Sequence, residues 1–232
     1  MGQAAQDFLR YYNEIDYKLK QLTGERGSVP FWKRLRIAAK KEPCLKRYYD
    51  DILECHELRN AIIHHKSYPE EVIAEPAEHI VELMREIYTR LFEPPRVIPA
   101  FESDVHVFSP HTPLKEVLQY MYSRGYSQVL SRASGLLKLT TSSGITRWLA
   151  AMVNAGEVPF ETTTLSAVHE FDRPDAMKLL SRGASVDEAL AIFQATLSQK
   201  RPRLFAIVIT ETGQGHEEPL GIITPRDLLG EE

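Results

Sequence analysis

The sequence has little of several features that define specialised protein classes. It contains two cysteines, Cys44 and Cys55, in 232 residues, which are too few for a disulfide scaffold and favour a reducing compartment. Its formal net charge is only -4, so the whole chain is not a polycation that coats nucleic acid. No apolar run approaches the roughly 20 residues of a membrane helix, and the N-terminus MGQAAQDFLRYYNE lacks the apolar core of a signal peptide. These absences predict a cytoplasmic protein with no membrane partner.

Residues 1–92 follow a helical pattern. Apolar residues recur at spacings of three and four, which is typical of one face of an amphipathic helix, and they are Phe8, Tyr12, Ile15, Leu19 and Leu22. Similar stripes occupy residues 29–41, 43–62 and 80–91. Four amphipathic helices with short connections predict a helical bundle. The next segment, EPPRVIP at residues 93–99, contains three prolines and is interpreted as a linker.

Residues 100–232 change to alternating short strands and helices, which indicates an α/β unit. The order strand, helix, strand, strand, helix fits the sequence twice, at about residues 100–155 and about residues 160–232. A near-repeat of this kind predicts a pseudo-symmetric domain of two modules. The expected fold class is therefore α plus α/β, with an N-terminal helical bundle followed by this domain.

The segment PLGIITPRDLL, residues 219–229, places Thr224 at the end of an apolar strand and Asp227 at the start of a helix. The first copy has a similar segment, GLLKLTTSSGITRWL, at residues 135–149. Both segments resemble the end of a CBS (cystathionine β-synthase-type) module, and the resemblance covers roughly residues 100–232. It implies a tandem CBS pair, or Bateman module, with an adenine nucleotide as regulatory ligand: AMP, ADP, ATP or a signalling nucleotide.

The residue types in the second copy suit a nucleoside. Asp227 can accept hydrogen bonds from ribose hydroxyls, Thr224 can bond a ribose or phosphate oxygen, and Arg226 offers a fork for phosphate. Backbone amides at the helix start also suit phosphate. The resemblance implies that the strand around Phe205 and Ala206 lines the adenine. The alternative is that Thr224 and Asp227 only cap a helix.

The first copy departs from this pattern. Thr141 aligns with Thr224, but Gly144 falls where Asp227 stands, so the carboxylate for the ribose is missing. We therefore expect one good nucleotide site and not two equal ones. His111 and Lys138 are interpreted as surface residues.

A second motif lies in ECHELRNAIIHHKSYPEE, residues 54–71, where Arg59, Asn60 and His64 form the pattern Arg-Asn-x-x-x-His. The pattern and the helical setting resemble HEPN domains, many of which are metal-independent ribonucleases while others are binding or dimerisation units. Asn60 and His64 share a helix face, and Arg59 lies about 140° from His64 around the axis. The resemblance implies a homodimer in which two such helices meet around one phosphate.

The chemistry of the three residues suits RNA cleavage. RNA carries its own nucleophile, the 2′-hydroxyl, so the prediction includes neither a catalytic metal nor a cofactor. His64 can transfer protons near neutral pH, and Arg59 can stabilise the charge that develops on phosphorus. Asn60 can orient His64 or contact a phosphate oxygen. The expected products are a 2′,3′-cyclic phosphate and a 5′-hydroxyl.

A cationic strip lies upstream of this motif. Between Arg26 and Arg47 there are eight Lys or Arg and one acid, Glu42. Its candidate RNA-binding residues are Lys33, Arg34 and Arg36. The alternative is an ordinary solvated helix face.

The sequence as a whole predicts a dimeric, metal-independent endoribonuclease that an adenine nucleotide regulates by shifting conformational populations. The alternative is a non-catalytic nucleotide-sensing adaptor whose HEPN-like bundle serves dimerisation or partner docking. In a third interpretation the CBS pair is a structural clamp without a ligand.

Overall fold

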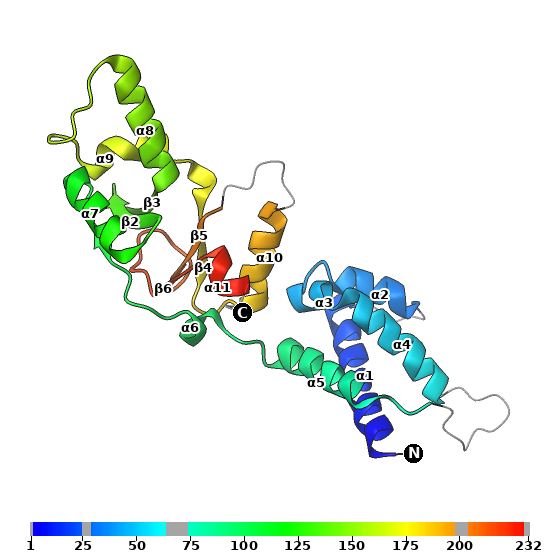
Figure 1. Ribbon diagram of the computed structural model, residues 1–232. Coiled ribbons are helices and arrows are strands. Elements are labelled where there is room, and N and C mark those ends of the chain that lie inside the picture. The colour runs from blue at the N-terminus through cyan, green and yellow to red at the C-terminus, as the bar shows by residue number, and fades with distance from the viewer. Residues whose placement is uncertain (1, 25–28, 64–73, 198–203, 230–232) are drawn as a thin grey trace. The chain divides into compact units, whose positions relative to one another are not determined.

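The computed structural model describes residues 2–24, 29–63, 74–197 and 204–229 (Figure 1). The chain divides into two compact units, which we call unit 1 (Met1–Pro95) and unit 2 (Arg96–Glu232). Unit 1 is helical and unit 2 combines helices with two sheets, so the prediction of a chain with both helical and mixed α/β parts is confirmed. None of the described helices is both long and apolar enough to cross a membrane.

Unit 1 consists of helices around one apolar core. The described helices are α1 (Gln3–Thr23), α2 (Phe31–Ala38), α3 (Pro43–Arg47), α4 (Tyr49–Ile63) and α5 (Glu78–Phe92). The stripe of α1 is buried as its spacing predicts, from Phe8, which is fully buried, to Leu19. It packs against apolar residues of the other helices, including Leu35, Ile52 and Ile87.

The single helix expected from Pro43 to Ile62 is interrupted at Tyr48. The backbone there has φ -100° and ψ 25°, outside the helical values, so α3 ends and α4 begins around this residue. Hydrogen bonds still continue across the break, from the Tyr48 N–H to the Cys44 carbonyl (3.1 Å) and from the Ile52 N–H to the Tyr48 carbonyl (2.9 Å). The apolar spacing did not reveal the break because both helices keep their apolar residues in the same core.

Unit 2 contains two halves with the same topology. The first half has α6 (Val97–Ala100), β1 (Val107–Phe108), α7 (Leu114–Arg124), β2 (Gln128–Ala133), β3 (Leu136–Thr141) and α8 (Ser142–Ala155). The second half has α9 (Leu165–Val168), the 3₁₀ helices η1 (His169–Phe171) and η2 (Pro174–Ala176), β4 (Met177–Ser181), α10 (Val186–Leu197), β5 (Ala206–Thr210), β6 (Gly221–Ile223) and α11 (Pro225–Leu229). In each half the first strand is parallel to the second, and the second is antiparallel to the third.

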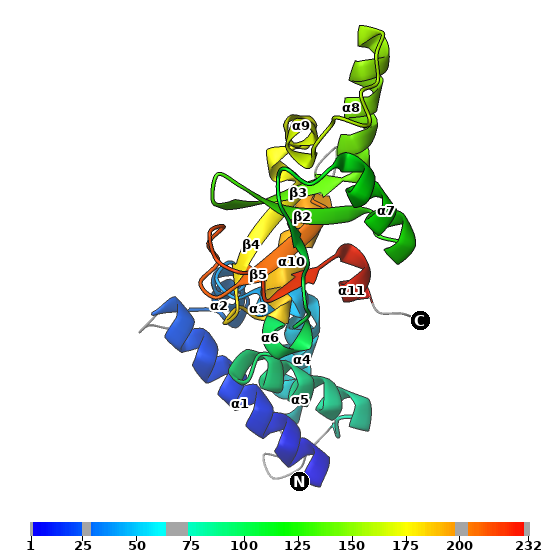
Figure 2. The ribbon, with the colours of Figure 1, turned by 90° about the vertical axis from the view of Figure 1, so that its left-hand side faces the viewer.

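The two sheets face each other across an apolar layer (Figure 2). Leu130 and Leu139 of the first sheet contribute to the same buried cluster as Ala206 and Val208 of the second. A further link joins β3 to the β5–β6 connection, where the Leu137 N–H donates to the Gly215 carbonyl at 2.8 Å. This layer fixes the two halves as one body, so residues from both can form a common site.

We call the segment at the start of each half, which contains α6 in the first half and α9 in the second, its lead segment. Each lead segment is hydrogen-bonded to the other half. The Val97 N–H, at the start of the first half, donates to the Ala184 carbonyl at 3.0 Å, just before α10 of the second half. Conversely, the Leu114 N–H at the start of α7 donates to the Thr163 carbonyl (2.9 Å), just before α9. Each half therefore begins with a segment that is paired to the other half.

Candidate functional site

A cavity of about 1050 Å³ lies in unit 2, and both halves line it. The first half contributes residues 101–106, 124–130 and Tyr120, and the second contributes residues 224–227, Leu204, Phe205 and Ile222. Four of the six residues predicted to bind nucleotide are in this wall, namely Thr224, Arg226, Asp227 and Phe205. The structure thus brings together most of the predicted set, in the second half only.

The Thr224–Asp227 pair is ordered by its own hydrogen bonds. Asp227 Oδ2 accepts from the Thr224 N–H at 2.6 Å and from the Thr224 hydroxyl at 2.7 Å. A carboxylate that bonds back to the residue before a helix is half of a capping box, so the capping alternative describes these bonds correctly. Asp227 is nevertheless exposed in the cavity wall, where a ligand can reach its carboxylate. Because α11 has only five residues, its dipole adds little attraction for phosphate.

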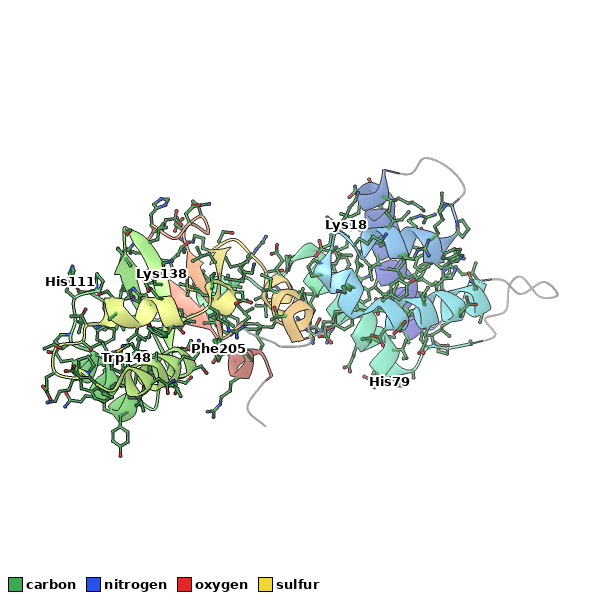
Figure 3. The ribbon with its side chains drawn as sticks, turned by 90° about the horizontal axis from the view of Figure 1, so that it is seen from above. Lys18, His79, His111, Lys138, Trp148 and Phe205 are labelled. Atoms are coloured by element: carbon green, nitrogen blue, oxygen red, sulfur yellow. The ribbon has the colours of Figure 1, made fainter. Side chains whose placement is uncertain are left out.

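Aromatic residues also line the cavity, and most of them were not predicted from the sequence. Tyr120 and Tyr126 meet edge to face with ring centroids 5.9 Å apart, and the Arg124 guanidinium lies 5.9 Å from the Tyr120 ring centroid. Tyr126 is 52% exposed, and Phe205 (Figure 3) is 37% exposed. Exposed aromatic rings beside a cavity offer flat surfaces on which a base can stack. The available signal was the run YMYSRGY at residues 120–126, at the end of α7.

Charges of both signs line the cavity. The basic residues are Arg124 and Arg226, and the acidic residues are Glu102, Asp104 and Asp227. This mixture can bind a ligand that carries both hydroxyl groups and a limited negative charge.

The other two predicted nucleotide-binding residues are buried outside this cavity wall. Thr141 is 1% exposed and caps α8, since its hydroxyl oxygen accepts from the Gly144 N–H at 3.0 Å. Ala206 is fully buried in the layer between the sheets. Neither side chain is among those that line this cavity, and nucleotide binding by Thr141 and Ala206 stays a prediction. His111 and Lys138 (Figure 3) are exposed, as their interpretation as surface residues expected.

In unit 1, Arg59 and Asn60 belong to a chain of hydrogen bonds along α4. Arg59 donates to Asn60 Oδ1 at 3.2 Å, and the Asn60 amide lies 3.3 Å from His56 Nε2. His56 Nδ1 is bonded to the Tyr12 hydroxyl at 2.6 Å, and its ring stacks on Phe31 with centroids 4.1 Å apart. The third predicted catalytic residue, His64, lies outside the described residues.

His56 is the centre of this network, a role that the sequence analysis did not assign. Burial is the main cause that lowers its pKa, and the charge of Arg59 acts in the same direction while Glu57 opposes it. A neutral imidazole explains how Nε2 can accept from the Asn60 amide. The available signal was the spacing of four between His56 and Asn60, which places both on one helix face.

One of the three predicted RNA-binding residues, Arg34, is buried. Arg34 is 9% exposed, forms an ion pair with Asp16 of α1 and donates to the Val29 carbonyl at 3.0 Å. Its guanidinium therefore joins α2 to α1 and is not presented to RNA, which corrects the prediction for Arg34. Lys33 and Arg36 are exposed, and the Arg36 guanidinium lies 5.3 Å from the ring centroid of the half-exposed Trp32.

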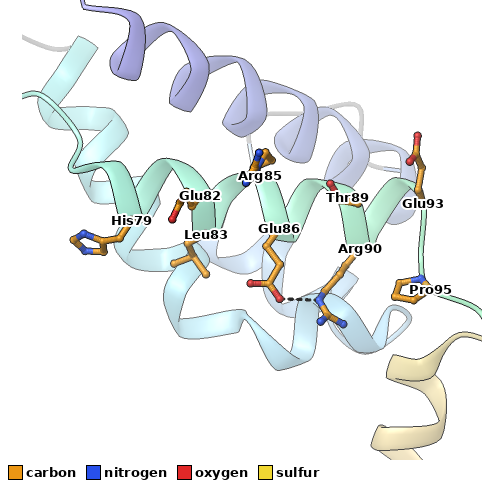
Figure 4. Close-up of a pocket in the computed structure, with 9 residues that line it drawn as sticks. All are labelled: His79, Glu82, Leu83, Arg85, Glu86, Thr89, Arg90, Glu93 and Pro95. Carbon is orange, nitrogen blue, oxygen red and sulfur yellow. Dashed lines mark hydrogen bonds and ion pairs between the residues drawn. The ribbon is translucent and has the colours of Figure 1, made fainter. Parts of the chain in front are cut away.

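A second hollow, of about 770 Å³, lies along α5 (Figure 4). Its lining comes from this helix and the residues that follow it, and Glu86 and Arg90 form an ion pair across one helical turn at 2.9 Å. The Tyr48 hydroxyl also donates to Glu86 at 2.7 Å, and this bond is the main cause that lowers the pKa of Glu86. We assign no ligand to this hollow, because these polar groups bind each other.

In the part of the chain that the structure describes, no three or more His, Cys, Asp or Glu side chains gather as a metal site would require.

No family model matches the sequence, and no curated protein is significantly similar to it. Several solved structures with a similar chain trace are CBS-domain proteins by name. A conserved CBS-domain protein from Thermoplasma acidophilum aligns at 12% identity and a TM-score of 0.43, covering 58% of this chain and 67% of that one. A hexameric CBS-CP12 protein from bloom-forming cyanobacteria aligns at 13% identity and a TM-score of 0.42, covering 59% and 67%. A Methanocaldococcus jannaschii protein aligns at 18% identity and a TM-score of 0.45 over 68% of this chain, which spans about half (54%) of that protein.

Proposed function

We propose that unit 2 is a tandem CBS-type regulatory module that binds an adenine nucleotide in the cavity lined by Thr224 and Asp227. The observation that carries this proposal is the composition of the cavity wall. It combines exposed aromatic rings (Tyr126 and Phe205), a hydroxyl and carboxylate pair, and two arginines in one space of about 1050 Å³. A nucleotide has one group for each of these: a base to stack, ribose hydroxyls, and a phosphate.

Each part of the nucleotide has an assigned neighbour. The ribose hydroxyls donate to the exposed carboxylate of Asp227, and Arg226 or Arg124 binds the phosphate. The adenine stacks on Tyr126 or Phe205, which lie on opposite halves of unit 2. A ligand that uses Tyr126 or Arg124 together with Asp227 contacts both halves at once, and its binding free energy then depends on how the halves are arranged.

Calorimetric titration of the full chain with AMP, ADP and ATP tests the nucleotide site. Asp227→Ala should weaken binding by roughly 10- to 100-fold, because a hydrogen bond to a charged group contributes about 1.5–3 kcal/mol. Glu157→Gln, at an exposed position in the first half, is the matched control and should bind as the wild type does. Equal affinity of Asp227→Ala and the wild type, or no binding of any of the three nucleotides, contradicts the proposal.

A second proposed function belongs to unit 1, in which Arg59, Asn60 and His64 cleave RNA without a metal and leave a 2′,3′-cyclic phosphate. The observation that favours it is the chain of hydrogen bonds from Tyr12 through His56 to Asn60 and Arg59. Such a chain holds the amide of Asn60 and the guanidinium of Arg59 in fixed positions at one end of α4. Fixed polar groups are what stabilisation of a phosphorane requires.

Incubation of RNA with the purified protein in EDTA tests this function. Cleavage should be lost in His64→Ala and in Arg59→Ala and should persist in His79→Ala, a matched control at an exposed histidine of α5. A DNA strand of the same sequence should stay intact, because it lacks the 2′-hydroxyl. Cleavage that survives in His64→Ala contradicts the proposed site.

Absence of cleavage, together with nucleotide binding, favours the adaptor alternative, in which the bundle serves dimerisation or docking. In both alternatives the protein is proposed to be a homodimer, which light scattering after gel filtration measures directly.

Nucleotide control is proposed to act by differential affinity for two arrangements of the protein. A protein that binds nucleotide and cleaves RNA at the same rate with and without it contradicts this coupling.

A further inference from the structure

The two halves of unit 2 have equivalent motifs at the end of the third strand, which we call the first motif (residues 141–144) and the second motif (residues 224–227). In the second motif, Asp227 accepts hydrogen bonds from the N–H and the hydroxyl of Thr224. In the first motif, Asp172 accepts from the same two groups of Thr141, the N–H at 3.2 Å and the hydroxyl at 2.7 Å. The carboxylate that the first motif lacks in sequence is thus supplied from 31 residues further along the chain.

Asp172 reaches this position because the second half has a longer lead segment. The first residues of α6 and α7, Val97 and Leu114, are 17 positions apart, whereas the corresponding residues of α9 and α10, Leu165 and Val186, are 21 apart. The four additional residues lie in the part of the chain that contains η1, Asp172 and η2. The corresponding part of the first half, residues 101–106, lines the open cavity beside the second motif.

The longer lead segment is held against the first half at three points. His169 Nε2 is hydrogen-bonded to the hydroxyl of the buried Ser131 on β2 at 2.8 Å. Arg147 of α8 donates to the Phe171 carbonyl at 2.7 Å. Asp172 itself is bound to Thr141, and a second nitrogen of Arg147 is 3.9 Å from its carboxylate. The position of Asp172 is therefore set by its own contacts and by those of His169 and Phe171, which precede it in sequence.

Gly144 is the residue that makes room for this carboxylate. A β-carbon built at position 144 would overlap both oxygens of Asp172. Glycine costs stability in a helix relative to alanine, and Gly144 is in the first turn of α8. The close approach of Asp172 supplies a physical reason for glycine at this position.

The exposure of the two carboxylates differs. The side chain of Asp172 is 6% exposed, whereas Asp227 is an exposed residue of the cavity wall. We propose that the carboxylate of Asp172 fills the position in the first half that corresponds to the ligand site of the second half. Unit 2 then takes one nucleotide per chain, at the second motif. The identity of the ligand rests on the proposed function, but the closure of the first motif by Asp172 does not.

A double-mutant cycle in the full chain tests the closure without any ligand. Gly144→Ala should lower the melting temperature of the wild type, and should leave it unchanged or raise it when Asp172→Ala has removed the overlapping atoms. Asp172→Asn keeps the side-chain volume, so Gly144→Ala should remain costly in that background. Ser143→Ala, at the exposed neighbouring position, is the control and should have the same effect in every background. An equal effect of Gly144→Ala in the wild type and in Asp172→Ala overturns the closure.

Hydrogen exchange supplies a second readout if Asp172→Ala folds poorly. The amide of Thr141, which donates to Asp172, should exchange faster in Asp172→Asn than in the wild type, because a neutral amide oxygen is a weaker acceptor than a carboxylate. The amide of Thr224, bonded to Asp227, should be unaffected. Unchanged exchange at Thr141 overturns the assigned role of Asp172.

Counting bound AMP at saturation tests the consequence for binding. The proposal expects one equivalent per chain in the wild type and, at the same AMP concentration, a smaller bound fraction in Asp227→Ala. Two equivalents in the wild type overturn it. Zero equivalents refute the proposed nucleotide site, and the closure of the first motif is then decided by the double-mutant cycle alone.

Discussion

The interior of unit 1 and the cavity of unit 2 use similar side chains in opposite ways. In unit 1, Arg34 is 9% exposed and forms an ion pair with Asp16, and this pair joins α2 to α1. In unit 2, Arg226 and Asp227 are both exposed and line a cavity. A buried ion pair is costly to break because one charge is left uncompensated, whereas exposed charges contribute little to stability. Exposure, rather than residue type, therefore distinguishes the charges that pack unit 1 from those that line the cavity of unit 2.

The largest effect is expected from breaking the buried pair. Asp16→Ala should reduce the free energy of unfolding by about 3 kcal/mol, because it leaves the Arg34 guanidinium buried without its carboxylate. Arg226→Ala should change it by no more than about 0.5 kcal/mol, as is usual for exposed sites. Urea denaturation followed by circular dichroism measures both. A cost for Asp16→Ala as small as that for Arg226→Ala would show that the Asp16–Arg34 pair contributes no more to stability than an exposed charge does.

A smaller effect is expected from the hydrogen bond between Tyr12 and His56. Tyr12→Phe should cost about 1 kcal/mol, because it removes a 2.6 Å hydrogen bond and leaves His56 Nδ1 without its partner. Tyr17→Phe, on the same helix at a 58% exposed position, is the control and should be neutral. The same denaturation experiment distinguishes them, and equal costs would show that the network does not stabilise unit 1.

The stability of unit 1 should also depend on pH through His56. Burial lowers the pKa of His56 in the folded protein, so folding favours the neutral ring, and this contribution is complete above the unfolded value of about 6.5. It is lost as the pH falls through 6.5 toward the lower folded pKa. The charged groups that act on His56 are Asp16, Arg34, Glu57 and Arg59. Denaturation at pH 7.5 and pH 5.5 should show a smaller fall in stability for His56→Gln than for the wild type, and an identical fall would exclude His56 as its source.

The smallest effect on stability is expected from the exposed cations of α2. Replacing Lys33 and Arg36 by Gln should leave stability within about 0.5 kcal/mol. If these residues contact RNA phosphates, the slope of log K against log salt should become less steep by roughly 0.7 for each contact with a single strand. Lys115→Gln, at an exposed position in unit 2, is the control. An unchanged slope in the double variant would assign Lys33 and Arg36 to a solvated helix face.

Local patterns in the sequence predicted what depends on near neighbours. The spacing of Phe8 and Leu19 predicted α1 and its buried face, because one helix face is set by residues three and four apart. The Thr224–Asp227 pair was found for the same reason, since its partners are three residues apart.

Features that depend on distant partners were not predicted. Arg34 looked like a surface cation because its partner, Asp16, is 18 residues away on another helix. The carboxylate of Asp172 meets Thr141 across 31 residues, a separation that the sequence pattern did not reveal. Tyr126 and Phe205 enter one cavity wall because the two sheets pack face to face, which no local spacing encodes.

The exchanged lead segments have a consequence for how such a module can be assembled. Because Val97 is paired with Ala184 and Leu114 with Thr163, neither half contains all the backbone partners of its own elements. A polypeptide with a single half would have to obtain the missing partner from another molecule, as a strand-swapped dimer does. Joining two halves in one chain makes that exchange intramolecular, and each half is then free to accumulate its own substitutions. Two motifs of common form can in this way differ in structure: Thr141 is bound by the buried carboxylate of Asp172, whereas Thr224 and Asp227 line an open cavity.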